Sequence, residues 1–414
     1  MSARLGKRFA HLWAASGCAN LGDGVLAVAM MLLAARLTTS ATLIAAVTVA
    51  SQLPNALATL PAGALADRLD RRALMVGVNL ARALAVAVAV ALELGGLLDL
   101  PALYALAFAL GTCEVLVDAT AQSTVPMTVP RERLAAANGR LMGAQVTANE
   151  FVGAPLAGAL VAVAMAWALG GPAVLYLLAA LLLRRMPGDY RARRPSAPGS
   201  LRSDIAEGVG FLLRNPLLRT LALMAALANI AASGVFAVFV LYVVGPDSPM
   251  GLPESAFGLL MACVAVGAVT GSVLAERLQH LVGRVRLLTA TILGWAVAFT
   301  IPALTSALVP VALALVTSGL LMMQANVIMV SLRQLVVPTR LLGRTNATMR
   351  LLGVGMAPLG AAIAGPVADA FGLHAVFLGA AALTLLALPG FVVVTPARLV
   401  AAEEATAGPQ PSVY

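Results

Sequence analysis

The chain has 414 residues, of which 61% are hydrophobic and only 11% are charged, and its mean hydropathy is +0.94. This composition excludes a water-soluble protein of this size, and a formal net charge of +9 scattered among long apolar runs does not indicate nucleic-acid binding. The composition therefore predicts an all-α protein whose solvent is a lipid bilayer.

The apolar runs set the number of membrane spans, because a helix needs about 20 apolar residues to cross the hydrocarbon core. Runs bounded by Gly, Pro and Arg predict twelve transmembrane helices, at residues 9–35, 41–66, 73–97, 101–124, 141–166, 170–186, 217–244, 256–276, 287–305, 308–332, 347–369 and 373–395. The first run carries Asn20 and Asp23 and is too long for a cleaved signal peptide. We therefore interpret it as the first span.

The spans group into two six-helix bundles. We predict an N-terminal bundle at 1–186, a cytoplasmic linker with an amphipathic helix at 187–216, a C-terminal bundle at 217–398 and a disordered cytoplasmic tail at 399–414. Two segments repeat at nearly the same spacing: GALADRL at 63–69 returns as SVLAERL at 272–278, and VPRERLAAANG at 129–139 returns as VPTRLLGRTNA at 337–347. Such a duplication predicts pseudo-symmetric halves with a substrate site between them near the bilayer midplane.

The basic residues test this topology, because cytoplasmic loops collect Lys and Arg. In the predicted scheme Arg36 alone falls in an outer loop and Arg82 alone lies deep in a span. The remaining basic residues alternate between loops as the rule requires, so both termini are expected in the cytoplasm. Cys18, Cys113 and Cys263 lack metal-ligand spacing, and we expect no metal site.

A cytoplasmic loop motif identifies a family. The segment GALADRLDRRAL, Gly63 to Leu74, resembles the signature between the second and third helices of the major facilitator superfamily. The first half also resembles the drug and siderophore exporters of that superfamily, including macrolide-efflux and enterobactin-exporter relatives. The segments that carry this likeness are GDGVLAVAM, LGTCEVLVDATAQSTVP and LAAANGRLMGAQVTANEFVGAPLAG. The resemblance implies the twelve-helix major facilitator fold. Asp70 is a departure, because the general signature has Gly there.

The loop motif has a physical interpretation of its own. Gly63 permits close helix contact, and Asp67 is placed to accept hydrogen bonds from an arginine or from the N-terminus of another helix. The functional interpretation is that the motif forms a latch that holds the protein in one conformation. The residues of this latch are Gly63, Asp67, Arg68, Arg71 and Arg72. The alternative is a solvated turn whose charges only fix topology.

Five ionisable residues lie mid-span in the first half, away from the ends of the predicted helices. Because each costs roughly 2.5–3.5 kcal/mol to insert, each is a functional candidate. The five residues are Asp23, Arg82, Glu114, Asp118 and Glu150. We expect Asp23, Glu114 and Glu150 to contact protons or a substrate cation, Asp118 to act as a relay and Arg82 as the fixed counter-ion. The alternative is that Arg82 and one acid form a static structural pair.

The second half has no carboxylate mid-span, and its mid-span polar groups are neutral instead. Asn229, Gln324 and Asn326 are expected to contribute hydrogen bonds to the cavity. Two small-residue spacings, Gly267-xxx-Gly271 and Ala154-xxx-Gly158, predict close helix contacts. Energy coupling is therefore expected in the first half.

The chain contains no nucleotide-binding loop, so we expect the proton gradient, with no cofactor, to supply the energy. The sequence favours a proton-coupled exporter of hydrophobic or amphiphilic small molecules in the bacterial inner membrane, acting as a monomer and not as an enzyme. Drugs, antibiotics, siderophores and secondary metabolites are the expected substrates. The alternatives are a proton-coupled importer or facilitator of a polar metabolite, and a non-transporting membrane sensor on the same scaffold.

Overall fold

The computed structural model of the protein describes residues 6–191, 209–337, 348–349, 353–395 and 397–398. Within these ranges the chain is built from helices, with one isolated bridge between Val244 and Leu252. The predicted tail at 399–414 and most of the predicted linker helix lie outside the described residues. Residues 209–214, at the end of that linker, are helical.

The first half contains six spans, two of which are divided into shorter helices. The second span consists of α2 and α3, and the fifth consists of α6, the π-helical segment η2 and α7. The elements are α1 (Lys7–Leu37), α2 (Ala41–Leu57), α3 (Thr59–Arg68), α4 (Arg71–Leu94), α5 (Leu100–Thr128), the short η1 (Arg131–Arg133), α6 (Leu134–Val146), η2 (Thr147–Gly153), α7 (Ala154–Val163) and α8 (Met165–Arg184).

The second half repeats this plan. Its helices are α10 (Pro216–Val243), α11 (Glu254–Val282), α12 (Arg284–Leu304), α13 (Leu308–Val336), the short η3 (Val354–Met356), α15 (Ala357–Phe371), α16 (Leu373–Leu385) and η4 (Leu388–Val392). In the described part of the chain ten helical segments are long and apolar enough to cross a membrane, and α2 and α15 are shorter apolar helices. The twelve-helix fold expected from the sequence is confirmed.

A proline lies near the break in each of the two divided spans. Pro155 is the second residue of α7 and comes just after η2. A proline ring clashes with the carbonyl one turn earlier, and the wider π turn relieves that crowding, so Pro155 explains the interruption of the predicted span at 141–166. Pro54 lies inside α2, but the break after Leu57 follows it, and the Ala58 amide still donates to the Pro54 carbonyl at 2.7 Å.

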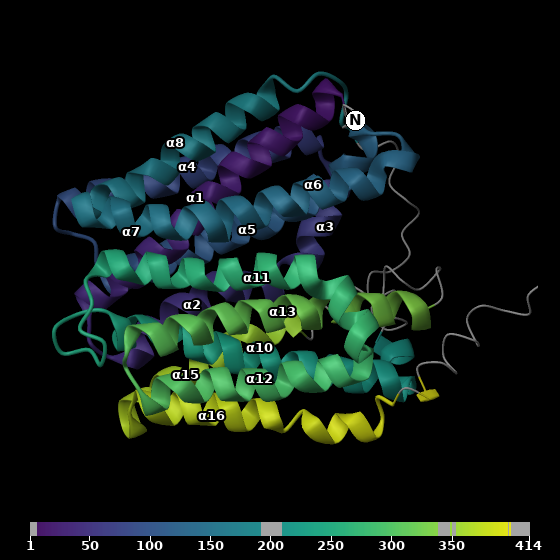
Figure 1. The fold of residues 1–414 in the computed structure, drawn as a ribbon. Coiled ribbons are helices and arrows are strands. Elements are labelled where there is room, and N and C mark those ends of the chain that lie inside the picture. Colours follow the sequence, from purple (N-terminus) through teal and green to yellow (C-terminus); the bar gives the residue numbers. More distant parts are fainter. Residues whose placement is uncertain (1–5, 192–208, 338–347, 350–352, 396, 399–414) are drawn as a thin grey trace, which may run out of the picture.

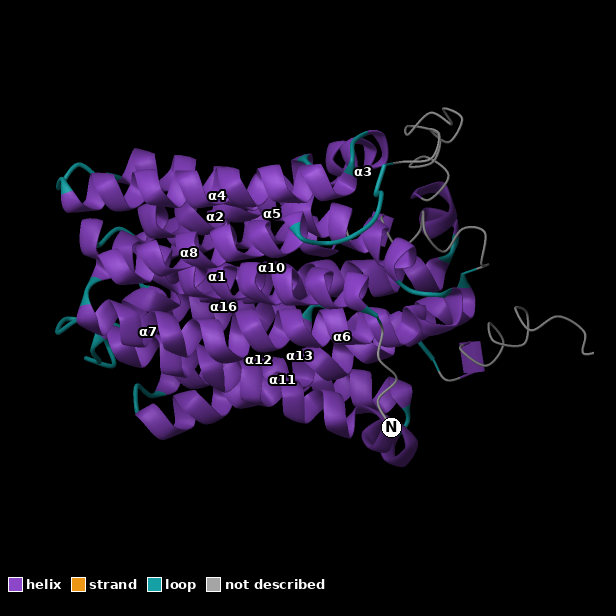
Figure 2. Ribbon diagram, turned by 90° about the horizontal axis from the view of Figure 1, so that it is seen from above, coloured by secondary structure: helices purple, strands orange, loops and turns teal. Residues whose placement is uncertain are grey.

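The two halves lie side by side with their helices running in the same general direction (Figure 1). The view from above shows the same lengthwise packing (Figure 2). Inside the first half, α8 packs along α1 and α4, and α5 packs against α2 and α4; in the second half, α11 packs along α13. The halves meet through α2 against α15 and α10, and through α7 and η2 against α11. The substrate site that the duplication predicts between the halves would lie between these two sets of contacts.

Glycines permit the closest helix contact in the second half. A Cβ atom added at Gly267 of α11 would overlap the carbonyl oxygen of Val316 in α13, and one at Gly319 would overlap that of Val264. The close contact predicted for the Gly267-xxx-Gly271 spacing is therefore confirmed, because Gly271 likewise faces the Leu320 carbonyl at 2.6 Å from its added Cβ. Small residues in membrane helices typically allow the backbones of two helices to pack directly against each other.

We expect Gly267→Ala to destabilise the protein by about 1–3 kcal/mol, because α11 and α13 must move apart to admit the methyl group. The matched control is Gly379→Ala in α16, where an added Cβ meets no atom within 4 Å. The check is the melting temperature of each purified variant in detergent. Equal melting temperatures for the two variants would contradict the close contact.

Candidate functional site

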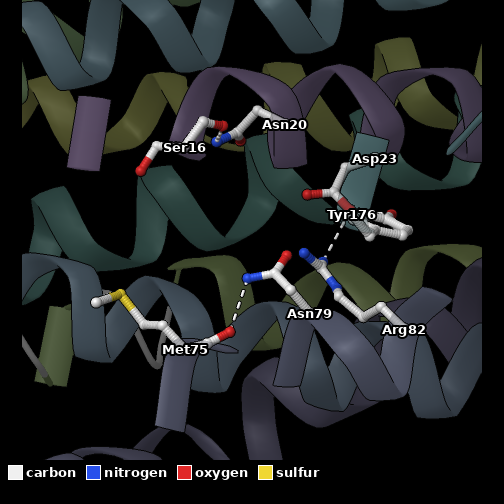
Figure 3. A network of polar contacts seen from close by, with 7 residues as sticks. All are labelled: Ser16, Asn20, Asp23, Met75, Asn79, Arg82 and Tyr176. Carbon is white, nitrogen blue, oxygen red and sulfur yellow. Dashed lines mark hydrogen bonds and ion pairs between the residues drawn. The ribbon is translucent and has the colours of Figure 1, made fainter. Parts of the chain in front are cut away.

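The centre of the first bundle holds an ion pair between α1 and α4. Arg82 Nη2 lies 2.8 Å from Asp23 Oδ1. Tyr176 of α8 donates its hydroxyl to the same Asp23 oxygen at 2.6 Å. The Arg82 guanidinium also lies over the Tyr176 ring, 4.8 Å from its centroid. Figure 3 shows the three side chains converging from three helices.

The pair is deeply placed. The Arg82 side chain is 1% exposed and the Asp23 side chain is 12% exposed. Arg82 is about 15 Å along α4 from its first residue, at a rise of about 1.5 Å per residue. Its Nε atom and the Oδ1 atom of buried Asn79, one turn earlier on α4, have no hydrogen-bond partner among the described residues. An arginine at this depth requires its counter-charge, because an unpaired buried charge is strongly destabilising.

Glycines on both sides of Asp23 explain why three helices approach it. A Cβ added at Gly22 would lie 3.1 Å from the Tyr176 ring, and one at Gly24 would overlap the Asn149 carbonyl oxygen. The Gly-Asp-Gly sequence thus lets α8 on one side and the π segment η2 on the other pack directly against α1. The carboxylate is placed where these helices and α4 meet.

The other predicted acids lie on helices that surround this pair. Glu114 and Asp118 are half-buried on α5, which packs against α1 and α4. Glu114 is close enough to Arg82 to interact with it electrostatically. Glu150 lies in η2, next to Asn149, whose backbone contacts Gly24; the Glu150 side chain is outside the described atoms. The structure therefore gathers these helices around one centre, and the roles of the acids in transport stay predictions.

Tyr176 was missed by the sequence analysis. It is fully buried, and a buried tyrosine needs a partner for its hydroxyl. The available signal was a lone tyrosine in the middle of the otherwise aliphatic sequence AVLYLLAALLL. That signal indicates a buried polar contact but does not identify the partner, because Asp23 is 153 residues away in the chain.

The loop motif connects elements of the first bundle. Asp70 caps α4 by accepting from the Ala73 amide at 2.9 Å, which explains an acid where the superfamily signature has Gly. Arg71 Nε donates to the Ala66 carbonyl at 3.3 Å, and Arg72 donates to the Met186 carbonyl at 2.9 Å. Gly63 and Arg68 lie in α3, which also carries Asp67, a residue whose side chain is outside the described atoms. The close helix contact expected at Gly63 is not present in this conformation, because a Cβ added there would meet no described atom within 4 Å. The latch function of Asp67 stays a prediction.

The three polar residues of the second half occupy different environments. Gln324 is fully buried and donates Nε2 to the Gly271 carbonyl at 2.7 Å, so in this conformation it joins α13 to α11 and does not line an open cavity. Asn229 is half-buried and donates to the Ala225 carbonyl of its own helix at 2.8 Å. Asn326 is exposed. The sequence alone did not distinguish these three environments, because an Asn or Gln side chain that bonds to the backbone occupies the same kind of mid-span position as one that faces a cavity.

The halves are joined by polar contacts at the end of the bundle opposite the basic loops. We call this end the low-charge end because its loops carry few Lys and Arg residues. The contacts there involve residues 36–42, Glu254 and Asp369. Arg36 Nε and Nη2 donate to the two carboxylate oxygens of Glu254 at 2.7 and 2.6 Å. Asp369 of α15 accepts from three donors at the start of α2: the Ala41 amide at 2.7 Å, the Thr42 amide at 3.0 Å and the Ser40 hydroxyl at 2.9 Å. An acid of one half therefore caps a helix of the other.

Two six-helix bundles, a buried ion pair between the first and third spans that a tyrosine of the sixth span contacts, and the loop motif after the second span are features of a multi-pass transporter of the major facilitator superfamily, the class that the family model and the curated relatives show. The chain belongs to the transmembrane secretion effector family, whose model matches residues 4–412.

Curated relatives match over almost the whole chain. The multidrug efflux pump Tap of Mycolicibacterium fortuitum is 31% identical over 405 residues, which cover 92% of this chain and 93% of that protein. Tap of Mycobacterium tuberculosis is 29% identical over 434 residues, covering 98% and 95%.

Solved structures show the same fold at low sequence identity. The nucleoside transporter NupG matches with a TM-score of 0.72 and 14% identity, over 95% of this chain and all of that one. A bacterial homologue of the iron transporter ferroportin, in an inward-facing state, matches with a TM-score of 0.73 and 18% identity, over 95% of this chain and 99% of that one.

Proposed function

We propose that this protein is a proton-driven exporter of hydrophobic or amphiphilic small molecules that works by alternating access in the bacterial cytoplasmic membrane. The similarity to the Tap proteins, which are named multidrug efflux pumps, supports the export of drug-like molecules. The proton gradient supplies the energy, and no cofactor is required. The protein functions as a monomer with both termini in the cytoplasm.

The observation that carries the proposal is the Asp23–Arg82 pair. The Asp23 side chain keeps some exposure while the Arg82 side chain is fully buried, which supports proton uptake at the carboxylate. Protonation of Asp23 removes the negative charge that links α1 to Arg82 of α4, and deprotonation restores it. An ion pair that is made and broken in this way couples proton movement to the packing of the first bundle.

The contacts at the low-charge end support a conformation closed on the outer side. The basic loops are expected in the cytoplasm, which places Arg36, Glu254 and Asp369 at the outer surface. These contacts must break for the outer side to open, because each joins one bundle to the other. The arrangement supports an inward-facing or closed state of the transport cycle.

The test is efflux of a panel of lipophilic dyes and drugs from cells that express the protein. We expect efflux that an uncoupler abolishes, and at least about a tenfold loss of efflux for Asp23→Asn at equal expression. The matched control is Asp247→Asn, an exposed acid in the loop between α10 and α11, which should leave efflux unchanged. Efflux that persists with the uncoupler present would contradict proton coupling.

A further inference from the structure

The two oxygens of the Asp23 carboxylate have different environments. Both contacts of the carboxylate, from Arg82 Nη2 at 2.8 Å and from the Tyr176 hydroxyl at 2.6 Å, fall on Oδ1. Among the described residues Oδ2 has no such contact, and Figure 3 shows this oxygen turned away from Tyr176. A proton can therefore bind Oδ2 without displacing either donor on Oδ1.

Tyr176 is fixed more firmly than the acid it contacts. It is fully buried, its ring packs under the Arg82 guanidinium, and the backbone of Gly22 lies directly against it. Its hydroxyl has little freedom to leave Asp23. A hydroxyl that donates to a carboxylate stabilises the ionised form more than the neutral form.

We infer that Tyr176 is a positioning residue that holds Asp23 Oδ1 against Arg82 and leaves Oδ2 as the atom that takes up and releases the proton. This inference rests on the proposed proton coupling and deepens it. In the ionised state Oδ1 receives both donors. When a proton binds Oδ2, the carboxyl becomes neutral, the attraction to Arg82 is lost, and Tyr176 still donates to the carbonyl oxygen Oδ1. Release of the proton from Oδ2 restores the pair.

Other titratable groups also surround the carboxylate. Arg82 faces it from α4 and Tyr176 from α8, while Cys113 and Glu114 of α5 lie within electrostatic range of the pair. Glu150 belongs to η2, which packs against α1. The helices α2 and α7, which also contact α1, carry no titratable residue. Tyr176 differs from the other groups because it is a neutral donor that bonds directly to Asp23.

The test is the replacement Tyr176→Phe, which keeps the ring and removes the hydroxyl. Infrared titration of the purified protein in nanodiscs should show a protonated-carboxyl band that is absent in Asp23→Asn. We expect the midpoint of this band to move to higher pH by about 1 pH unit in Tyr176→Phe, because a hydrogen bond to a charged group is lost. The pH dependence of efflux should move in the same direction.

The matched control is Tyr242→Phe. Tyr242 is also fully buried and donates one hydrogen bond, to the Thr305 carbonyl at 2.7 Å, and within the described ranges its hydroxyl bonds to no acid. Its replacement should leave the titration midpoint unchanged. If Tyr176→Phe does not fold, 3,5-difluorotyrosine at position 176 supplies a stronger donor, and the midpoint should then move to lower pH.

The outcomes separate the inference from the proposed function. Identical midpoints for the wild type and Tyr176→Phe, with uncoupler-sensitive wild-type efflux, would overturn the role of Tyr176 alone. Wild-type efflux that is insensitive to the uncoupler would overturn proton coupling itself. The absence of any Asp23-dependent band over the accessible pH range would overturn proton exchange at Oδ2.

Discussion

Replacing Asp23 with alanine is expected to reduce the folded yield sharply, because the substitution removes the carboxylate that pairs directly with the buried Arg82 guanidinium. Breaking a buried pair by removing one partner costs about 3–5 kcal/mol. Arg82 has 1% of its side chain exposed, and its Nε atom already lacks a partner among the described residues, so it has no route to solvent in this conformation. Size-exclusion chromatography of a fluorescent fusion, followed by thermal melting in detergent, measures this loss.

The double variant Asp23→Ala/Arg82→Met separates folding from transport. Removing both charges leaves no orphaned ion, so most of the lost stability should return. Proton-driven efflux should remain absent, because the titratable carboxylate is gone. A double variant that regains both stability and uncoupler-sensitive efflux would show that the pair is only structural. A single variant as stable as the wild type would show that the charge of Arg82 is satisfied elsewhere.

Removing the carboxylate of Asp369 is expected to shift the protein toward an outward-open conformation. Asp369→Ala deprives two backbone amides and one hydroxyl of α2 of their acceptor, and all three donors belong to the other bundle. The site is exposed, so water replaces part of the lost bonding. We estimate a change of about 1–2 kcal/mol, or roughly tenfold in the conformational equilibrium.

Distances between spin labels at the low-charge end report this shift. Leu97 and Leu304 are exposed and lie in different halves, so they accept labels in a background without the native cysteines. The matched control is Asp99→Ala, which removes a helix cap of the same kind, on Ala102 of its own bundle. We expect a longer-distance population for Asp369→Ala and none for Asp99→Ala. Equal distance distributions for the two variants would contradict a latch between the halves.

Hydropathy and charge were sufficient to predict the number and direction of the spans, because a bilayer imposes both the length and the composition of each span, while the loop motif identified the family. The same physics predicted that Arg82 pairs with an acid, since an isolated arginine at that depth is too costly. The sequence did not identify Asp23 as the direct partner among the four candidate acids. That choice depends on the side-by-side placement of α1, α4 and α8, to which Gly22 and Gly24 contribute.

Contacts between distant parts of the chain account for the remaining differences between the sequence-based predictions and the structure. Asp369 was counted only as the end of a predicted span, yet it bonds to Ala41, 328 residues away. Gln324 was expected in the cavity because it is polar and mid-span, but Gly271 exposes a backbone carbonyl that its amide can reach. In both cases the partner is a backbone amide or carbonyl. Every residue type has such a group, so the sequence does not show which residue will be the partner.

The uneven placement of charge affects how such proteins can diversify. In the part of the chain that the structure describes, the acidic and basic side chains in the middle of the spans belong to the first bundle. The second bundle packs mainly through apolar and aromatic residues, and Phe239, Tyr242 and Phe377 contact one another near the end of α10 and the start of α16. Mutations in the second bundle can therefore reshape its packing without changing a member of the Asp23–Arg82 pair. Under the proposed mechanism, cargo preference and energy supply are therefore open to separate inheritance, and we expect that an exchange of second halves between relatives alters what is carried while the proton-coupling pair is retained.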